Sequence, residues 1–239
     1  ALFAYTKRHT IELGLHFWGA TADGILANLA YPDKTLVETS LAQIRATIDT
    51  AARHNCLYVN IHPGHATKIH IDFDAQRIRI MSDPTDMDAA IERFLDHAQV
   101  LHEYATHKGV LLTIETAPPK DAADWSGDLA ARMHPLETHG LPIAAVIAAA
   151  RRGLYVANDV NHTAANAITD NPTDVWRLVR DTTKQLAPQT KLIHLGFCIP
   201  PYNGTDVHDH LDNPLFETDQ AVPNKQQMIE ILKLFADRD

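Results

Sequence analysis

The sequence alternates short apolar runs with longer segments of helical periodicity, and this order leaves few folds open. Parallel strands joined by crossover helices produce such an alternation. Each run is almost wholly apolar, which is typical of a parallel sheet whose two faces are both covered. The predicted strands are residues 11–17, 57–62, 110–115, 154–159 and 191–197.

The segments between these runs are predicted to be helices. In the first of them, Leu36, Ile44 and Ile48 recur at the spacing that places side chains on one helical face. A proline or an Asn or Asp cap stands near the beginning of most of these segments. The predicted helices are residues 34–54, 86–107, 142–152, 172–186 and 224–237. Residues 117–140, rich in Pro, Asp, Gly and His, are predicted to form a long loop after the third strand.

The fold class predicted from this pattern is α/β, a (β/α)₈ TIM barrel. Five strands are identified where a barrel needs about eight, so we expect the sequence to lack barrel strands at both ends. An open α/β sheet is the alternative. A length of 239 residues, 45% of them hydrophobic, suits a single domain over residues 1–239.

Charge and hydropathy narrow the expected location and partners. The formal net charge of −9 argues against a generally basic surface for nucleic acid, although bound cations would reverse the local sign. No apolar run approaches the roughly 20 residues of a membrane helix, and residues 1–8 do not form a signal peptide. We therefore expect a cytoplasmic protein without a membrane partner. Cys56 and Cys198 lie in apolar surroundings and are expected to be reduced core thiols.

Histidine and acidic side chains mark all five predicted strands. They are His16, His62, Glu115, Asp159 with His162 three residues later, and His194. The carboxyl ends of barrel strands converge on one face, so these side chains are expected to meet there. A carboxylate such as Glu115, inside an apolar run, is costly to bury without a partner, and a metal ion is one such partner. Imidazole with carboxylate suits zinc, manganese or iron.

A further candidate pair follows the last predicted strand. Asp206 and His208 form an Asp-x-His motif, whose two side chains point the same way in an extended segment. The pair could hold one metal ion. A solvated surface loop explains such a run equally well.

Taken together, these motifs resemble the xylose-isomerase-like barrel superfamily, in particular the endonuclease IV family of apurinic/apyrimidinic-site endonucleases. The resemblance extends from Leu13 to about His210. It is carried by His16 with residues 28–32, His62-Pro63-Gly64, Glu115-Thr116, Asp159-Val160-Asn161-His162, His194-Leu195 and Asp206-Val207-His208.

The resemblance implies up to three zinc ions, or manganese, and hydrolysis of a phosphodiester in abasic-site DNA. The implied ligands are Glu115, His16 and His62 around one pair of metals, Asp159 and His194 on the second ion, and His162, Asp206 and His208 on the third. Glu115 is the candidate catalytic residue. The family's last glutamate would fall at or past Asp239, or at Glu217 if residues 214–218 form the last strand.

Two other functions remain open. A sugar isomerase or epimerase of the same superfamily needs one metal, held by Glu115, Asp159, His194 and one further carboxylate, and acts on a small sugar by proton or hydride transfer. The acidic net charge and a loop after His16 that is long for a DNA-penetrating loop favour this alternative. A barrel that binds a small ligand without catalysis is the third possibility.

Overall fold

A five-stranded parallel sheet forms the centre of the computed structural model, which describes residues 2–122, 135–169, 171–206 and 209–236. Its strands are β1 (Leu15–His16), β2 (Tyr58–Ile61), β5 (Leu111–Glu115), β6 (Tyr155–Asp159) and β7 (Thr190–His194), paired in that order. Every pairing is parallel, and each strand neighbours the one before it in the sheet, as in a (β/α) barrel. All five predicted strands are present, each shorter than predicted.

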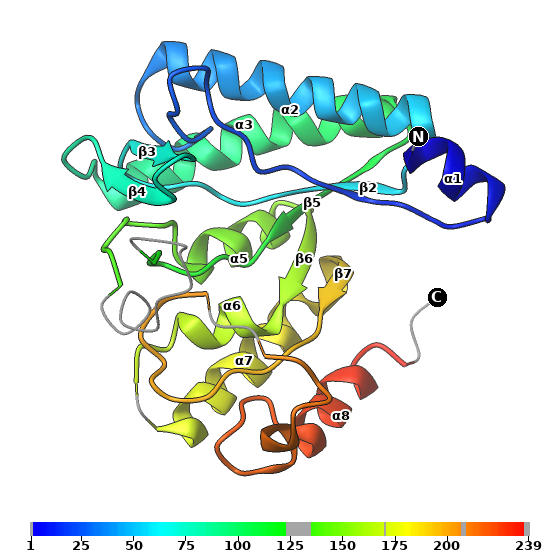
Figure 1. Cartoon of the computed structure of the whole chain (residues 1–239), viewed down its shortest axis with the longest axis vertical. Coiled ribbons are helices and arrows are strands. Elements are labelled where there is room, and N and C mark those ends of the chain that lie inside the picture. Colours follow the sequence, from blue (N-terminus) through cyan, green and yellow to red (C-terminus); the bar gives the residue numbers. More distant parts are fainter. Residues whose placement is uncertain (1, 123–134, 170, 207–208, 237–239) are drawn as a thin grey trace.

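Helices cover the sheet and follow the strands in sequence. The long ones are α2 (Lys34–His54), α3 (Met87–His107), α5 (Ile143–Arg151), α7 (Pro172–Leu186) and α8 (Lys225–Lys233). Figure 1 shows α2 and α3 side by side, and the helices continue in chain order, with α3 in contact with α5 and α5 in contact with α7. Two short helices, α1 (Leu2–Arg8) and α6 (Val160–Ala165), were not predicted.

Local capping explains why α2 and α3 begin and end within one residue of the predicted positions, whereas α8 ends at Lys233, short of the predicted residue 237. The Asp33 carboxylate accepts a hydrogen bond from the backbone N–H of Leu36, and Asp86 does the same for Ala89. At the other end of α2, Asn55 adopts a left-handed conformation with φ of 55° and closes the helix. These signals depend on neighbouring residues alone, so they can be read from the sequence.

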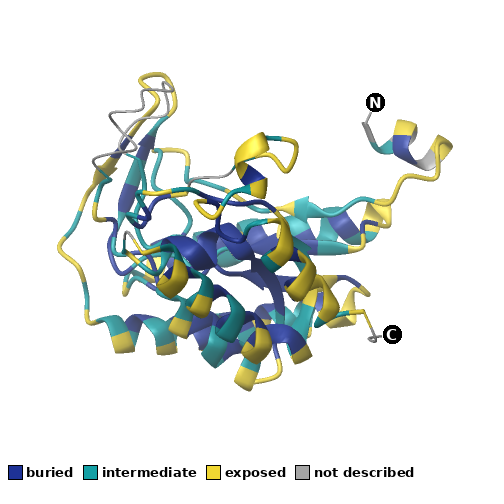
Figure 2. Ribbon diagram, turned by 90° about the horizontal axis from the view of Figure 1, so that it is seen from below, coloured by how far each residue is buried: buried dark blue, intermediate teal, exposed yellow. Residues whose placement is uncertain are grey.

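The main core lies between the sheet and helices α2, α3 and α5. Strand residues Ile61, Ile114 and Val156 are buried there, together with Phe94 of α3. Figure 2 shows the buried residues in the interior and the exposed ones on the outer sides of the helices. Consecutive residues of β2, β5 and β6 are buried, so these three strands are covered on both faces as their composition predicts, whereas β1 and β7 are partly exposed.

Replacing Phe94 by alanine is expected to lower the free energy of unfolding by about 3–5 kcal/mol, because a fully buried ring leaves a cavity. Denaturant unfolding followed by circular dichroism measures the loss. Val100→Ala on the same helix is the matched control, because Val100 is 45% exposed and its truncation should change stability by about 0.5 kcal/mol or less. Equal losses for the two variants would contradict this placement of the core.

A β-hairpin inserted between β2 and α3 was not predicted. It pairs β3 (Ile69–Asp72) with β4 (Arg77–Ile80) in antiparallel register. Ile69, Ile71 and Ile78 are buried in a small cluster of their own, against Leu26 and Leu136. Their alternation with polar residues indicates a two-faced ribbon, which a search for continuous apolar runs misses. Figure 1 shows the hairpin on the side of the molecule opposite both termini.

The predicted long loop after β5 lies beside this hairpin. Residues 117–122 lead away from the strand and residues 135–140 return. Isolated bridges join Asp121 to Leu136 and His65 to Gly140, so the described parts of the loop are tied to each other and to the segment after β2. Residues 123–134 lie outside the described part of the chain.

Two smaller expectations can also be compared with the structure. Cys56 and Cys198 are free and buried, which confirms that they are core thiols. Within the described residues, no helix combines the length and the apolar character needed to cross a membrane.

Candidate metal centre

Glu115 lies at the centre of the predicted cluster. It is the last residue of β5 and only 1% exposed. The side-chain amide of Asn60, on the neighbouring strand β2, donates a hydrogen bond to its Oε2. Thr113 Oγ1 in turn donates to Asn60 Oδ1 over 2.9 Å. Two polar side chains on adjacent strands therefore hold the carboxylate in place.

Two histidines face one oxygen of this carboxylate. His16, the last residue of β1, and His62, which follows β2, each place Nε2 at 3.4 Å from Glu115 Oε2. The ligand atoms of the three residues lie within 4.8 Å of one another. His62 Nε2 is buried and has no hydrogen-bond partner among the described residues. A buried imidazole nitrogen without a partner is costly, and a metal ion would satisfy it.

The other oxygen of Glu115 faces a second group. His194 Nδ1, at the end of β7, lies 2.9 Å from Glu115 Oε1 and 3.2 Å from Asp159 Oδ2. Glu115, Asp159 and His194 also have their ligand atoms within 4.8 Å of one another. The remaining oxygen of Asp159, Oδ1, accepts hydrogen bonds from the backbone N–H groups of Asn161 and His162, each with an N–O distance of 2.9 Å. Asp159 therefore caps α6. This cap orients Oδ2 toward His194.

His162 connects this group to the last predicted pair. Its Nδ1 lies 2.7 Å from the carbonyl oxygen of Thr116 and 3.3 Å from Glu115 Oε1. Its Nε2 lies 3.4 Å from Asp206 Oδ2. The structure thus brings together seven of the eight predicted residues: His16, His62, Glu115, Asp159, His162, His194 and Asp206. The eighth, His208, lies outside the described residues.

Glu217 does not belong to this cluster. Residues Pro214–Glu217 form a short 3₁₀ helix, not a strand, and the Glu217 side chain is exposed and paired with Lys225 Nζ at 2.6 Å. The condition for placing the family's last glutamate at this position, a strand over residues 214–218, is therefore not met. The residues that position Glu115, namely Asn60 and Thr113, were missed in the sequence. Their signal was a polar residue inside an otherwise apolar strand.

Burial and charge pull the pKa values of these groups in opposite directions. Burial raises the pKa of Glu115, but its contacts with His162, His194 and His62 outweigh burial and hold that pKa far below its ordinary value. Contacts with Asp159 and Glu115 raise the pKa of His194 to about 10. Burial lowers the pKa of His162, yet Asp159, Asp206 and Glu115 together raise it well above its ordinary value. Positive charge is therefore strongly stabilised at this site.

The pKa of His16 is shifted in the opposite direction from those of His162 and His194. Burial lowers its pKa, and the attraction of Glu115 is too weak to compensate. A neutral imidazole is the form that binds metal, so His16 is ready to act as a ligand. Neutral imidazole and carboxylate donors of this kind suit a divalent ion.

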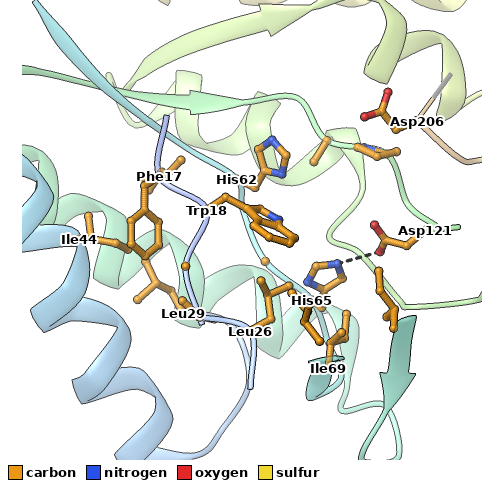
Figure 3. Close-up of a pocket in the computed structure, with 18 of the residues that line it drawn as sticks. Phe17, Trp18, Leu26, Leu29, Ile44, His62, His65, Ile69, Asp121 and Asp206 are labelled. Atoms are coloured by element: carbon orange, nitrogen blue, oxygen red, sulfur yellow. Dashed lines mark ion pairs between the residues drawn. The ribbon is translucent and has the colours of Figure 1, made fainter. Parts of the chain in front are cut away.

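A cavity of about 460 Å³ opens beside the metal centre. Figure 3 shows His62 and Asp206 at one side of it and a group of apolar side chains at the other. The cavity also contains His65, whose Nε2 lies 3.4 Å from Asp121 Oδ2. The candidate metal site therefore adjoins a space large enough for a small molecule.

Several solved structures share this fold at low sequence identity. A D-tagatose 3-epimerase-like protein is 14% identical with a TM-score of 0.57, over 98% of this chain and 81% of the other. D-psicose 3-epimerase with D-tagatose from Clostridium cellulolyticum H10 is 13% identical with a TM-score of 0.57, over 96% and 64%. A D-psicose 3-epimerase in the presence of D-fructose is 17% identical with a TM-score of 0.53. The alignment with this last protein covers 84% of this chain but only 58% of the epimerase.

Comparison with sequence families identifies the family, whereas the solved structures of low identity show only the fold. No curated protein matches the sequence. The model of the family described as xylose isomerase-like TIM barrel matches residues 3–134, more than half of the chain. The fold, the parallel strand order and this match agree. The chain belongs to the family of xylose isomerase-like TIM barrels.

Proposed function

We propose that the protein is a divalent-metal-dependent isomerase or epimerase of small sugars. The observation that carries the proposal is the group formed by Glu115, Asp159 and His194, whose ligand atoms lie within 4.8 Å of one another next to a cavity. The solved structures with the same fold that are named as sugar 3-epimerases support this choice over a hydrolase. The substrate would be a small ketose.

The residues of the centre suit the proposed reaction. A bound divalent ion would polarise the carbonyl and a neighbouring hydroxyl oxygen of the sugar. Glu115, Asp159 and His194 would hold this ion, with His194 oriented by both carboxylates. Glu115 is the candidate acceptor, at Oε2, of the proton on the carbon beside the carbonyl. His62, which lines the cavity and places Nε2 at 3.4 Å from Glu115 Oε2, is the candidate for exchanging this proton with Glu115.

Metal content and turnover together test this proposal. Plasma mass spectrometry of the purified full-length protein should find close to one zinc or manganese ion per chain. The protein loaded with that ion should interconvert D-fructose, D-psicose or D-tagatose, as followed by chromatography. A protein that holds its ion and turns over none of the sugars would overturn the proposal.

A phosphodiester hydrolase, as the resemblance to endonuclease IV implies, is the second candidate. One observation favours it: His16 and His62 form a separate group around the same Glu115, and His162 contacts Asp206. A one-metal enzyme leaves His16 and the contact between His162 and Asp206 without a role, whereas a cluster of two or three ions would use them. Close to three ions per chain, together with cleavage of an oligonucleotide that contains an abasic site, would favour this function.

His16→Ala separates the two candidates. Under the proposed function, the variant should keep its ion and lose less than about tenfold in sugar turnover, because His16 lies outside the Glu115, Asp159 and His194 group. Under the hydrolase alternative, it should lose an ion and more than about 100-fold in cleavage. His107→Ala, at an exposed position at the end of α3, is the control and should change neither quantity. Metal content and initial rates are measured side by side.

A further inference from the structure

The cavity beside the metal centre carries polar side chains at two separate places on its wall. The lining side chains that can form hydrogen bonds, among the described residues, are those of Trp18, His62, His65, Asp121 and Asp206. His62 and Asp206 belong to the side that adjoins the metal centre. Figure 3 shows His65 and Asp121 together at another place, between that side and Ile69. Neither of these two residues belongs to a group of potential metal ligands in the described part of the chain.

Neighbouring residues hold the Asp121 carboxylate in place. Its Oδ2 accepts a hydrogen bond from Thr138 Oγ1 over 2.7 Å and lies 3.4 Å from His65 Nε2. The backbone of Asp121 pairs with that of Leu136 through two hydrogen bonds, of 3.2 and 2.8 Å. Thr138 is fully buried, and its carbonyl oxygen accepts a hydrogen bond from Thr67 over 2.7 Å. A carboxylate held at these points loses little conformational entropy when it binds a ligand.

The Asp121 carboxylate brings a negative charge to the cavity. Burial raises its pKa, but contacts with His65 and Thr138 outweigh burial and hold that pKa below its ordinary value. The side chain is still 32% exposed, and both neighbours engage Oδ2. The other oxygen, Oδ1, can therefore accept hydrogen bonds from a molecule in the cavity. Such bonds to a charged oxygen are stronger than those to a neutral one.

A ketose bound at the metal centre has further hydroxyl groups that the ion does not reach. A hydroxyl that leaves water without a new partner weakens binding, because its hydrogen bonds are lost. Aliphatic lining residues such as Ile69 and Leu26 offer no such partner, whereas Asp121 does. The carboxylate therefore matches the part of the sugar chain beyond the chelated oxygens.

The same carboxylate disfavours an anionic substrate. No Lys or Arg lines the cavity in the part of the chain that the structure describes, and Asp121 and Asp206 are both acidic. A phosphate ester on the sugar would approach these charges, and no basic side chain of this wall would offset the repulsion. The cavity is therefore suited to a neutral sugar.

We infer that Asp121 selects the substrate through the hydroxyl groups that the metal does not bind, and that this substrate is an unphosphorylated ketose. The inference rests on the proposed function, whose substrate class it narrows. Asp121 is a specificity-determining residue that contacts the sugar away from the reacting carbon. His65 and Thr138 are positioning residues, which act through Asp121.

Titration calorimetry of the Mn²⁺-loaded protein with two ketoses tests this inference. D-erythrulose has the chelating end of D-fructose but lacks its last two carbons and their hydroxyl groups. Asp121→Asn should weaken binding of D-fructose about tenfold, because a charged acceptor is lost, and binding of D-erythrulose less than about twofold. Each sugar is compared with itself, so differences in ring form cancel. Equal losses for the two sugars would overturn the inference.

Asp74→Asn is the matched control for this substitution. Asp74 is exposed, lies in the turn between β3 and β4 and does not line the cavity. The variant should bind both sugars as the unaltered protein does. A selective loss of D-fructose binding in Asp74→Asn would show that the effect does not depend on the cavity and would count against Asp121.

Thr138→Val tests the positioning role. It removes the hydrogen bond to Asp121 Oδ2 at a residue that does not line the cavity. Binding of D-fructose should weaken about threefold while that of D-erythrulose changes less than about 1.5-fold. Equal weakening of both sugars would contradict an action through Asp121.

A phosphorylated sugar provides a measurement on the unaltered protein, which decides the question if the variants do not fold. D-fructose 6-phosphate should bind at least about tenfold more weakly than D-fructose, because its charge meets Asp121 and Asp206. Equal or tighter binding of the phosphate ester would overturn the inference.

The same titrations without Mn²⁺ separate this inference from the proposed function. If Mn²⁺ strengthens binding of both sugars but Asp121→Asn weakens both equally, the role of Asp121 is refuted and the metal-dependent function stands. If Asp121→Asn selectively weakens D-fructose binding and Mn²⁺ adds nothing, the role of Asp121 stands and the proposed function fails. Both effects together support both.

Discussion

Replacing Glu115 by glutamine is expected to lower the affinity for a divalent ion by more than about 100-fold and to abolish turnover. Oε1 of this carboxylate faces His194 and His162. Its other oxygen, Oε2, faces His16 and His62 and accepts a hydrogen bond from the side-chain amide of Asn60. An amide keeps one acceptor oxygen and turns the other position into an N–H donor. It therefore cannot serve both groups, and the negative charge that a cation needs is lost.

Metal content by plasma mass spectrometry and initial rates measure this effect, and circular dichroism shows whether the fold persists. Glu38→Gln, on the exposed face of α2, is the matched control and should retain wild-type metal content. Wild-type metal content in Glu115→Gln would refute the assignment of Glu115 as a ligand. Loss of metal with an intact fold would support it.

Metal affinity is expected to rise about tenfold for each pH unit between roughly 7 and 9, or about 100-fold over that interval. The reason is the pKa of His194, which Asp159 and Glu115 raise to about 10 in the metal-free protein. His194 therefore carries a proton at neutral pH, and an ion must displace that proton to bind its nitrogen. Competition titrations with a chelating dye at several pH values measure the slope. The variant His194→Asn should show a shallower one.

The metal-free protein should respond to pH in the opposite sense. The pKa of His194 is higher in the folded chain than its ordinary value of 6.5, so the folded state binds the proton more tightly. This contribution to stability is fully present below about pH 6.5 and is lost as the pH rises through about 10. Denaturation without metal should accordingly become easier from pH 7 to 10. An affinity for metal that does not change over pH 7 to 9 would contradict the role of His194.

The choice between two functions shows where sequence motifs stop being informative. The ligand-type residues His16, His62 and His162 suggest a hydrolase, and the structure does place them around Glu115. The same cluster contains a complete three-residue group for a single ion. Which group binds metal depends on relative affinity, and a list of residue types does not contain that quantity.

The sequence alone determined the five strands of the parallel sheet, the five long helices and the end of the sheet at which the ligand-type residues lie. Helical period, N-caps and apolar runs are local signals, so α2 and α7 begin and end at the predicted residues. The positions of Glu115, Asp159 and His194 at strand ends follow from the alternation of strands and helices, because parallel strands bring their carboxyl ends to one face.

Only the tertiary structure decided how these side chains meet. Asn60 reaches Glu115 from 55 residues away, and this contact requires the register in which β2 pairs with β5. The β3–β4 hairpin and the cavity that it lines arise from packing between Leu26, Leu136 and the hairpin isoleucines. Such contacts join residues far apart in the chain, and their energies depend on distances that no local pattern specifies.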